Sequence, residues 1–159
     1  MSAVEDRLTA LGHTLPAVVP PVAAYVPAVR AGDLVFTSGQ LPMVGGRLPA
    51  TGKVGEAVDA ADARAYAATC ALNALAAIKA VVGDLDRVAG VVKVVGFVAS
   101  APSFTGQPGV VDGASELLAA AFGERGMHAR SAVGVAALPL DAPVEVEVVV
   151  SLGEEPGRP

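Results

Sequence analysis

The chain has 159 residues, a formal net charge of −5, and 53% hydrophobic residues with no Trp. This length fits one ordinary hydrophobic core, which must be built mainly from Val, Ala and Leu. Side chains of this size pack in thin layers, and thin layers favour a sheet covered by helices. The eleven Lys and Arg residues are scattered through an acidic chain, which excludes the clustered basic surface that nucleic-acid binding needs. We therefore expect a single domain without a nucleic-acid partner.

The N-terminal residues 1–24 are expected to form a short helix and an arm outside the main domain. The helix is predicted from Val4 to Leu11, with Gly12 as its C-terminal glycine, followed by an ordered, proline-bearing arm. Charged residues occur from the fifth position onward, and no apolar segment of signal length is present, which predicts a cytoplasmic protein.

Two strands and a long helix follow the arm. The strands are predicted at Tyr25 to Arg30 and Leu34 to Ser38, and the Gly-Asp pair between them suits a tight hairpin turn. A loop rich in Gly and Pro leads to a helix from residue 58 or 59 to about Val82. Asn73 and Lys79 interrupt its apolar run, so we interpret it as a helix with one buried face and expect no membrane span.

The sequence of the second half of the chain predicts a strand, a helix and two further strands, in that order. Its members are a valine-rich central strand buried on both sides (residues 87–100), a helix from about Val111 to Phe122, and strands at about Ala129 to Ala136 and Val144 to Leu152. The tail after Leu152 (residues 153–159) should be disordered. The fold class is α+β, a mixed sheet with two helices on one face, in one domain over residues 25–152.

The sequence contains no motif for a nucleotide cofactor or a metal. No phosphate-binding loop or dinucleotide fingerprint is present, and neither His13 nor His128 shares a metal-ligand spacing with Cys, Asp or Glu. We expect His13 to be exposed and His128 to be a turn residue at a strand entry, in preference to a catalytic base. Cys70, the single cysteine, is expected to be buried and inert.

The stretch FTSGQ ends the second strand of the hairpin. It lacks the Gly-x-Ser-x-Gly elbow, so Ser38 is interpreted as a hydrogen-bonding residue at a strand end, in preference to a nucleophile. Gly39 either ends the strand or lets the backbone approach a ligand closely.

The final strand carries two carboxylates on one face. Because side chains alternate along a strand, Glu145 and Glu147 share a face with Val149, and the intervening valines share the other. The acidic face meets either water or a polar cleft, and Val149 on it indicates partial covering by another subunit. Arg130, at the start of the preceding predicted strand (about Ala129 to Ala136), is the only charged residue of that apolar strand.

The stretches YVPAVRAGDLVFTSGQLP and ARSAVGVAALPLDAPVEVEVVV together resemble the Rid family of reactive imine deaminases, also called the YjgF family. The resemblance covers roughly Tyr25 to Leu152. It implies a chorismate-mutase-like fold that assembles as a homotrimer with ligand clefts between subunits. It also implies hydrolysis of 2-imino or 2-enamino acids to 2-keto acids and ammonia, with no metal or organic cofactor.

The same resemblance implies roles for individual residues. Arg130 matches the arginine that binds the substrate carboxylate, and Glu145 matches the glutamate that positions the attacking water. Tyr25 and Gly39 match substrate-facing positions of the first motif, with Ser38 beside them. Ser115 on the preceding helix is a further candidate lining residue.

Three departures from the deaminase pattern mark a divergent branch. Gly134 stands where deaminases often carry glutamate, Ala132 replaces a small polar or sulfur residue, and the helix before Arg130 and the N-terminal arm both differ. The alternative function is a non-catalytic or regulatory module that binds small carboxylates on the same fold. Ribonuclease activity, sometimes attributed to family members, is disfavoured by the acidic charge balance.

Overall fold

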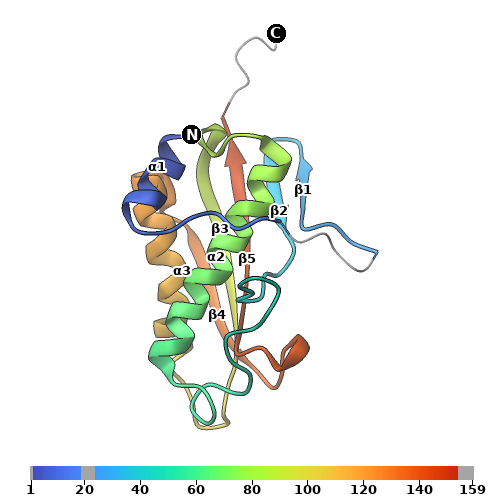
Figure 1. Ribbon diagram of the computed structural model, residues 1–159, viewed down its shortest axis with the longest axis vertical. Coiled ribbons are helices and arrows are strands. Elements are labelled where there is room, and N and C mark those ends of the chain that lie inside the picture. Colours follow the sequence, from blue (N-terminus) through green and yellow to red (C-terminus); the bar gives the residue numbers. More distant parts are fainter. Residues whose placement is uncertain (1, 19–23, 154–159) are drawn as a thin grey trace.

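The computed structural model describes residues 2–18 and 24–153, which form one five-stranded mixed sheet with helices on one face (Figure 1). The strand order is β1-β2-β5-β3-β4, with β3 and β4 parallel and the other neighbours antiparallel. The elements are α1 (Ala3–Ala10), β1 (Ala28–Ala31), β2 (Leu34–Thr37), α2 (Ala60–Val82), β3 (Val88–Ala99), α3 (Gln107–Phe122), β4 (Ala129–Val135) and β5 (Val144–Leu152). Short 3-10 turns occur at Leu85–Arg87, Gly123–Gly126 and Pro139–Asp141.

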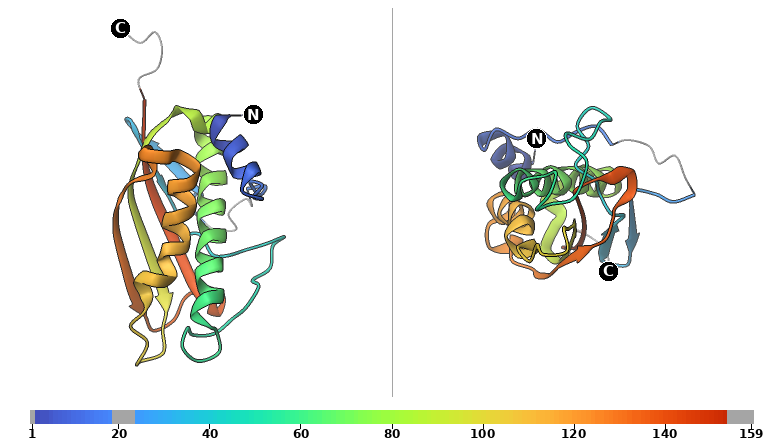
Figure 2. Two further views of the ribbon diagram at one scale, coloured as in Figure 1. Left: turned by 90° about the vertical axis from the view of Figure 1, so that its left-hand side faces the viewer. Right: turned by 90° about the horizontal axis from the view of Figure 1, so that it is seen from below.

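The predicted α+β fold with α2 and α3 on one face of the sheet is confirmed. Figure 2 shows the sheet as one layer, α2 and α3 as the second, and α1 against the outer side of the helix layer. Val4 and Leu8 of α1 belong to the hydrophobic core, so the N-terminal helix packs on the domain. The middle of the predicted arm (residues 19–23) and the predicted disordered tail beyond Gly153 lie outside the described residues.

The local signals placed most element boundaries within three residues. Gly32 adopts a left-handed φ of 62° in the predicted hairpin turn, and Asp59 caps α2 by accepting a hydrogen bond from the Ala61 amide. Helix α3 differs, because it begins at Gln107 and not at Val111. Pro108 lies in its first turn, where a residue without an amide hydrogen is tolerated.

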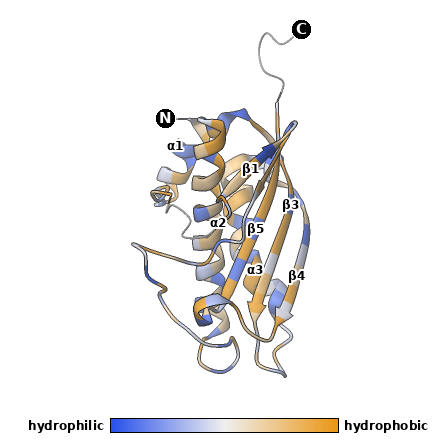
Figure 3. Cartoon of the chain, turned by 90° about the vertical axis from the view of Figure 1, so that its right-hand side faces the viewer, coloured by the Kyte–Doolittle hydropathy of each residue, from blue (hydrophilic) through white to orange (hydrophobic). Residues whose placement is uncertain are grey.

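Strand β3 is an interior strand, but the prediction that both of its faces are buried is wrong for the single chain. Val94 and Val98 are fully buried under the helices. On the opposite face, Val95 and Phe97 are only partly buried and Val92 is 42% exposed. The sheet strands nevertheless carry hydrophobic side chains along most of their length (Figure 3). The face without helices therefore carries apolar side chains together with the carboxylates of Glu145 and Glu147, and it remains accessible in the single chain.

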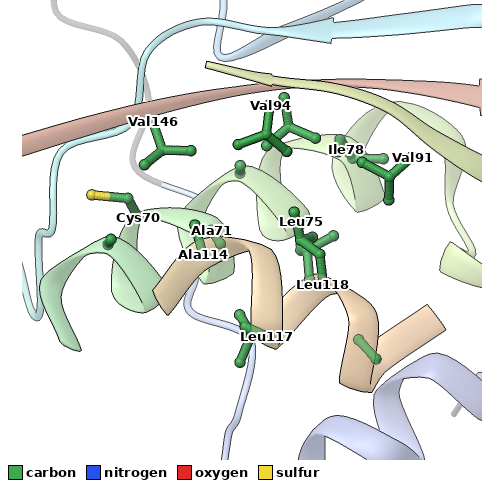
Figure 4. Close-up of a cluster of buried hydrophobic side chains, with 14 of the residues drawn as sticks. Cys70, Ala71, Leu75, Ile78, Val91, Val94, Ala114, Leu117, Leu118 and Val146 are labelled. Atoms are coloured by element: carbon green, nitrogen blue, oxygen red, sulfur yellow. The ribbon is translucent and has the colours of Figure 1, made fainter. Parts of the chain in front are cut away.

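The core between the layers is built from small and aliphatic side chains. Figure 4 shows Leu75 of α2 and Leu118 of α3 side by side, with Cys70 of α2 lying near Val146 of β5. All four of these residues are fully buried. Helix α2 has the length and hydropathy of a membrane span, but half of its most apolar window is buried inside the molecule, as in a core helix.

Helices α2 and α3 approach each other closely at Gly113. A Cβ atom at this position would lie 1.9 Å from the backbone carbonyl oxygen of Arg64. Backbone cannot move aside as a flexible side chain can, so we expect Gly113→Ala to reduce the free energy of unfolding by about 1–3 kcal/mol. Urea unfolding followed by circular dichroism measures this change.

The matched control for Gly113→Ala lies one turn earlier on the same helix. A Cβ at Gly109 would meet no atom within 4 Å, so Gly109→Ala should be neutral or stabilising by up to about 1 kcal/mol. Equal unfolding midpoints for the two variants would show that α2 and α3 are not in close backbone contact.

Candidate functional site

The residues predicted to act together fall into two groups on opposite faces of the sheet. Arg130 pairs in register with Val94, whose buried side chain points toward the helices, so Arg130 lies on the helix side of the edge strand β4. Glu145 pairs with Phe97 and alternates with buried valines, so it lies on the face without helices. Since β3 separates β4 from β5, a single chain does not bring Arg130 and Glu145 together.

The first group is a polar cluster where β4 meets α3, formed by Asp112, Ser115, His128 and Arg130 and named the arginine cluster here. Nη1 of Arg130 donates to Asp112 Oδ1 at 2.7 Å and to Ser115 Oγ at 3.2 Å. Within residues 2–18 and 24–153, Nε and Nη2 of this guanidinium have no hydrogen-bond partner. The side chain is 24% exposed, so it is held in place and still accessible.

His128 completes the arginine cluster. Its Nδ1 lies 2.6 Å from the Gly126 carbonyl oxygen, as suits the predicted turn residue, and its Nε2 lies 2.9 Å from Ser115 Oγ. Sequence reasoning singled out Ser115 and Arg130 but missed Asp112. The spacing of three residues between Asp112 and Ser115 on one predicted helix, which places them on the same face, was the available signal.

The second group places Glu145 against Gly39. A Cβ atom at Gly39 would lie 1.8 Å from Glu145 Oε1, so the carboxylate occupies space that only a glycine leaves open. Backbone hydrogen bonds in both directions between Gln40 and Val146 hold the two segments together. Burial raises the pKa of Glu145 above its ordinary value, and the nearby Glu147 carboxylate adds to this effect. Such a carboxylate holds a proton more readily than an exposed one.

Ser38 and Tyr25 lie near Gly39 in different settings. The Ser38 hydroxyl donates to the Val26 carbonyl oxygen at 2.6 Å, which matches its interpretation as a hydrogen-bonding residue at a strand end. Tyr25 is 58% exposed and lies just before β1. Tyr25 and Gly39 both line a cavity of about 380 Å³ between α2, the arm and the loop after β2.

The space beside Gly134, the position where deaminases often carry a glutamate, is occupied by a side chain from the start of α3. A Cβ at Gly134 would lie 2.8 Å from Nε2 of Gln107, the first residue of α3. That amide group donates to Ser100 Oγ and to the Phe104 carbonyl oxygen, which fixes it beside β4. The earlier start of α3 therefore supplies a neutral amide where deaminases often carry a carboxylate.

The remaining candidates for chemistry are not part of either group. Burial raises the pKa of the Cys70 thiol well above its ordinary value, and its sulfur lies 3.8 Å from the Val144 carbonyl oxygen, as expected for an inert thiol. His13 is partly buried, not exposed as predicted. Among the described residues, no group of three or more His, Cys, Asp or Glu side chains could hold a metal ion.

Comparison with known proteins identifies relatives over nearly the whole chain. The family described as "YjgF/chorismate_mutase-like, putative endoribonuclease" matches residues 5–152. Protein TCP17 of Trypanosoma cruzi is 47% identical over 150 residues, which are 94% of each chain. The crystal structure of Atu1372 from Agrobacterium tumefaciens is also 47% identical, with a TM-score of 0.90 over 95% of this chain and 93% of that one.

A more distant solved structure, E. coli TdcF with bound serine, shares the fold. It is 26% identical with a TM-score of 0.61, over 89% of this chain and 97% of that one. By TM-score the chain is thus more similar in structure to Atu1372 than to TdcF.

Proposed function

Because this chain belongs to the YjgF/chorismate mutase-like family, we propose that it hydrolyses reactive 2-imino and 2-enamino acids to 2-keto acids and ammonia. The sites are proposed to lie in clefts between the subunits of a homotrimer. The small-molecule character of the substrate is supported by TdcF, a relative with bound serine.

The observation that carries the proposal is the arrangement of Arg130. Asp112 and Ser115 both bind Nη1, so Nε and Nη2 remain as two adjacent, parallel donors. This pair matches the two oxygens of a carboxylate, and each charge-assisted bond contributes about 1.5–3 kcal/mol. The arginine cluster is therefore built to anchor the carboxylate of a small acid.

The second group supplies the complementary chemistry. Glu145 accepts a proton from water more readily than an exposed glutamate because burial raises its pKa. It is proposed to orient the water that attacks the imine carbon and to take up its proton. Gly39 leaves room for this carboxylate and a backbone surface for the substrate.

The separation of the two groups supports a site shared between subunits, as the proposed trimer requires. Arg130 lies on the edge strand β4, whereas Gly39 and Glu145 lie beyond β3 on the other face. A neighbouring subunit that presents its Glu145 group to the β4 edge would complete each cleft. It would also cover apolar side chains of the open face, including Phe36, which is 40% exposed.

Nucleic acid is a poor fit as the substrate, although the family description names an endoribonuclease. The chain has sixteen acidic residues against eleven Lys and Arg. In the described part, Arg64 and Lys79 are already paired with Glu116 and Glu5. Binding of a phosphate backbone needs a surplus of accessible cations on one surface.

The test generates 2-aminoacrylate in situ and follows release of pyruvate. We expect the purified protein to accelerate this release well above buffer and to sediment as a trimer in analytical ultracentrifugation. Intact trimers with no acceleration would contradict the proposed activity. Monomers that are fully active would contradict the cleft between subunits.

The second candidate is a module that binds small carboxylates without turnover. It is favoured by the neutral Gln107 amide at Gly134, where deaminases often carry a carboxylate. A ligand of the folded state raises the melting temperature whether or not it reacts, so thermal shift with pyruvate and serine is combined with the pyruvate-release assay. A raised melting temperature without release of pyruvate from 2-aminoacrylate supports the binding module, and release of pyruvate supports the deaminase.

A further inference from the structure

The cavity between α2, the N-terminal arm and the loop after β2 has the size of a small-molecule site. Its volume is about 380 Å³, within the range of ligand pockets in proteins. All three segments contribute apolar side chains to it, among them Val18, Met43 and Ala76. No charged side chain of the described residues lines it, and its polar side chains are neutral. An occupant therefore meets an apolar space without charges.

Asn73 is the polar side chain that α2 contributes to this cavity. Its Nδ2 donates to the carbonyl oxygens of Leu41 at 2.9 Å and Met43 at 3.1 Å, which uses both of its N–H groups. Within residues 2–18 and 24–153, Oδ1 of Asn73 has no hydrogen-bond partner. This side chain can therefore bind an occupant only as a hydrogen-bond acceptor.

The loop that forms one wall of the cavity has a fixed shape. The two hydrogen bonds from Asn73 hold its first part against α2. Gly45 and Gly46 follow with left-handed φ values of 57° and 79°, a conformation that glycine adopts without strain. Val44 and Arg47 close this turn with backbone hydrogen bonds in both directions. A ligand that binds such a preformed wall loses little free energy to ordering it.

The cavity is separate from the side chains proposed to carry out the reaction. Among the described residues that line it, none belongs to the arginine cluster and none is Glu145. Gly39 is a shared wall, because it lines the cavity while the Glu145 carboxylate occupies the space of its missing Cβ. The Glu145 side chain lies on the face of the sheet without helices, whereas Asn73 and Ala76 belong to α2 on the other face. The cavity thus lies behind the Glu145 group.

We propose that this cavity binds a neutral, mainly apolar small molecule that carries a hydroxyl or an amide N–H as the donor to Asn73. The apolar part of such a ligand is removed from water against Val18, Met43 and Ala76. A charged ligand would lose its hydration in the cavity without gaining a countercharge. The proposal goes beyond the deaminase function and does not depend on it, since neither Arg130 nor Glu145 takes part.

The test titrates the isotope-labelled full-length protein with benzyl alcohol and follows the amide signals by NMR. We expect the backbone signals of Gly39, Gly45 and Gly46 and the side-chain amide of Asn73 to shift, while those of the arginine cluster stay in place. Benzyl methyl ether keeps the ring and the oxygen but lacks the O–H donor, so it should bind up to about tenfold more weakly. Benzoate, which is charged, should leave the cavity signals unchanged.

Two substitutions change the cavity from opposite walls. Ala76→Met fills part of it, and Met43→Ala removes an apolar contact, so each should weaken the binding of benzyl alcohol by about tenfold. The matched controls are Ala80→Met, one turn later on α2 and outside the lining of this cavity, and Met127→Ala, at a side chain that is 75% exposed. Both controls should bind benzyl alcohol as the wild type does. If Ala76→Met does not fold, Met43→Ala decides the same question, because it only removes atoms.

Each outcome bears on the proposed site. Signals that shift around Gly39, Gly45 and Gly46, with binding weakened in the cavity variants and kept in the controls, would support it. No shift of these signals in the wild type, or equal binding in all folded variants, would overturn it. Equal shifts with benzoate would overturn the assignment of a neutral ligand. A wild type that binds benzyl alcohol but releases no pyruvate would contradict the deaminase and leave this site standing.

Discussion

Arg130→Ala is expected to lower kcat/KM for 2-imino acid hydrolysis by at least about 100-fold, with KM raised. The substitution removes two charge-assisted hydrogen bonds to the substrate carboxylate, each contributing about 1.5–3 kcal/mol, and 1.4 kcal/mol corresponds to a factor of ten. Arg130→Lys should lose most of the activity as well. An ammonium group can pair with Asp112 but cannot present two parallel donors.

The control for Arg130 is a second arginine paired with a carboxylate between α2 and α3. Arg64 contacts both oxygens of Glu116 at 2.6 Å and lies outside the arginine cluster. Its side chain is 42% exposed, so Arg64→Ala should cost no more than about 1 kcal/mol of stability and leave kcat/KM unchanged. Equal activity in the Arg64 and Arg130 variants, measured by pyruvate release, would show that Arg130 does not belong to the active site.

Glu145→Gln is expected to lower kcat by about 100-fold or more while leaving the binding of pyruvate intact. Glutamine fits the space beside Gly39 and can still hold a water, but it cannot take a proton from it. Steady-state kinetics and thermal shift with pyruvate together check this expectation. Loss of binding in parallel with kcat would instead make Glu145 part of the carboxylate anchor.

The same Glu145→Gln variant should be more stable than the wild type at neutral pH. Burial and the Glu147 carboxylate raise the pKa of Glu145 above 4.5, so the folded state holds this proton more tightly than the unfolded state does. Its contribution to stability is therefore fully present below the unfolded pKa and lost as pH rises through the raised folded pKa. Glutamine does not ionise, so its advantage over glutamate should appear as pH rises from below 4.5 to neutral.

Unfolding midpoints measured across this pH range, with Glu116→Gln as an exposed control, give the sign of the effect. Glu116 is 66% exposed and paired with Arg64, so its replacement should bring no gain at neutral pH. A difference between wild type and Glu145→Gln that does not change with pH would show that Glu145 titrates alike in the folded and unfolded states.

Most of the fold follows from local sequence signals. The hairpin could be predicted from the turn glycine at position 32. Helix α2 could be predicted from its apolar periodicity and from Asp59 at its start. The start of α3 was missed because Gln107 and Pro108 lie in a stretch with few apolar residues. Its first turn is instead stabilised by contacts across to the Ser100 hydroxyl and the Phe104 carbonyl.

Some residues of the candidate site could be singled out from the sequence, but their arrangement could not. Arg130 and Glu145 stand out because they are charged residues in strands rich in valine. Their separation depends on the sheet order, in which β3 enters between β4 and β5, and no local pattern encodes that order. Asp112 became a partner of Arg130 only through the packing of α3 against β4.

The sequence alone determined the elements, their apolar faces and the types of side chain available, because helix and strand periodicities act over a few residues. Tertiary structure decided which side chains meet. The contacts of Arg130 with Asp112 and Ser115 span 18 and 15 residues, and that of Gly39 with Glu145 spans more than 100. Such contacts form only when the buried faces of α2 and α3 fix the helices on the sheet, since burial of that shared core sets the positions of all the polar groups around it.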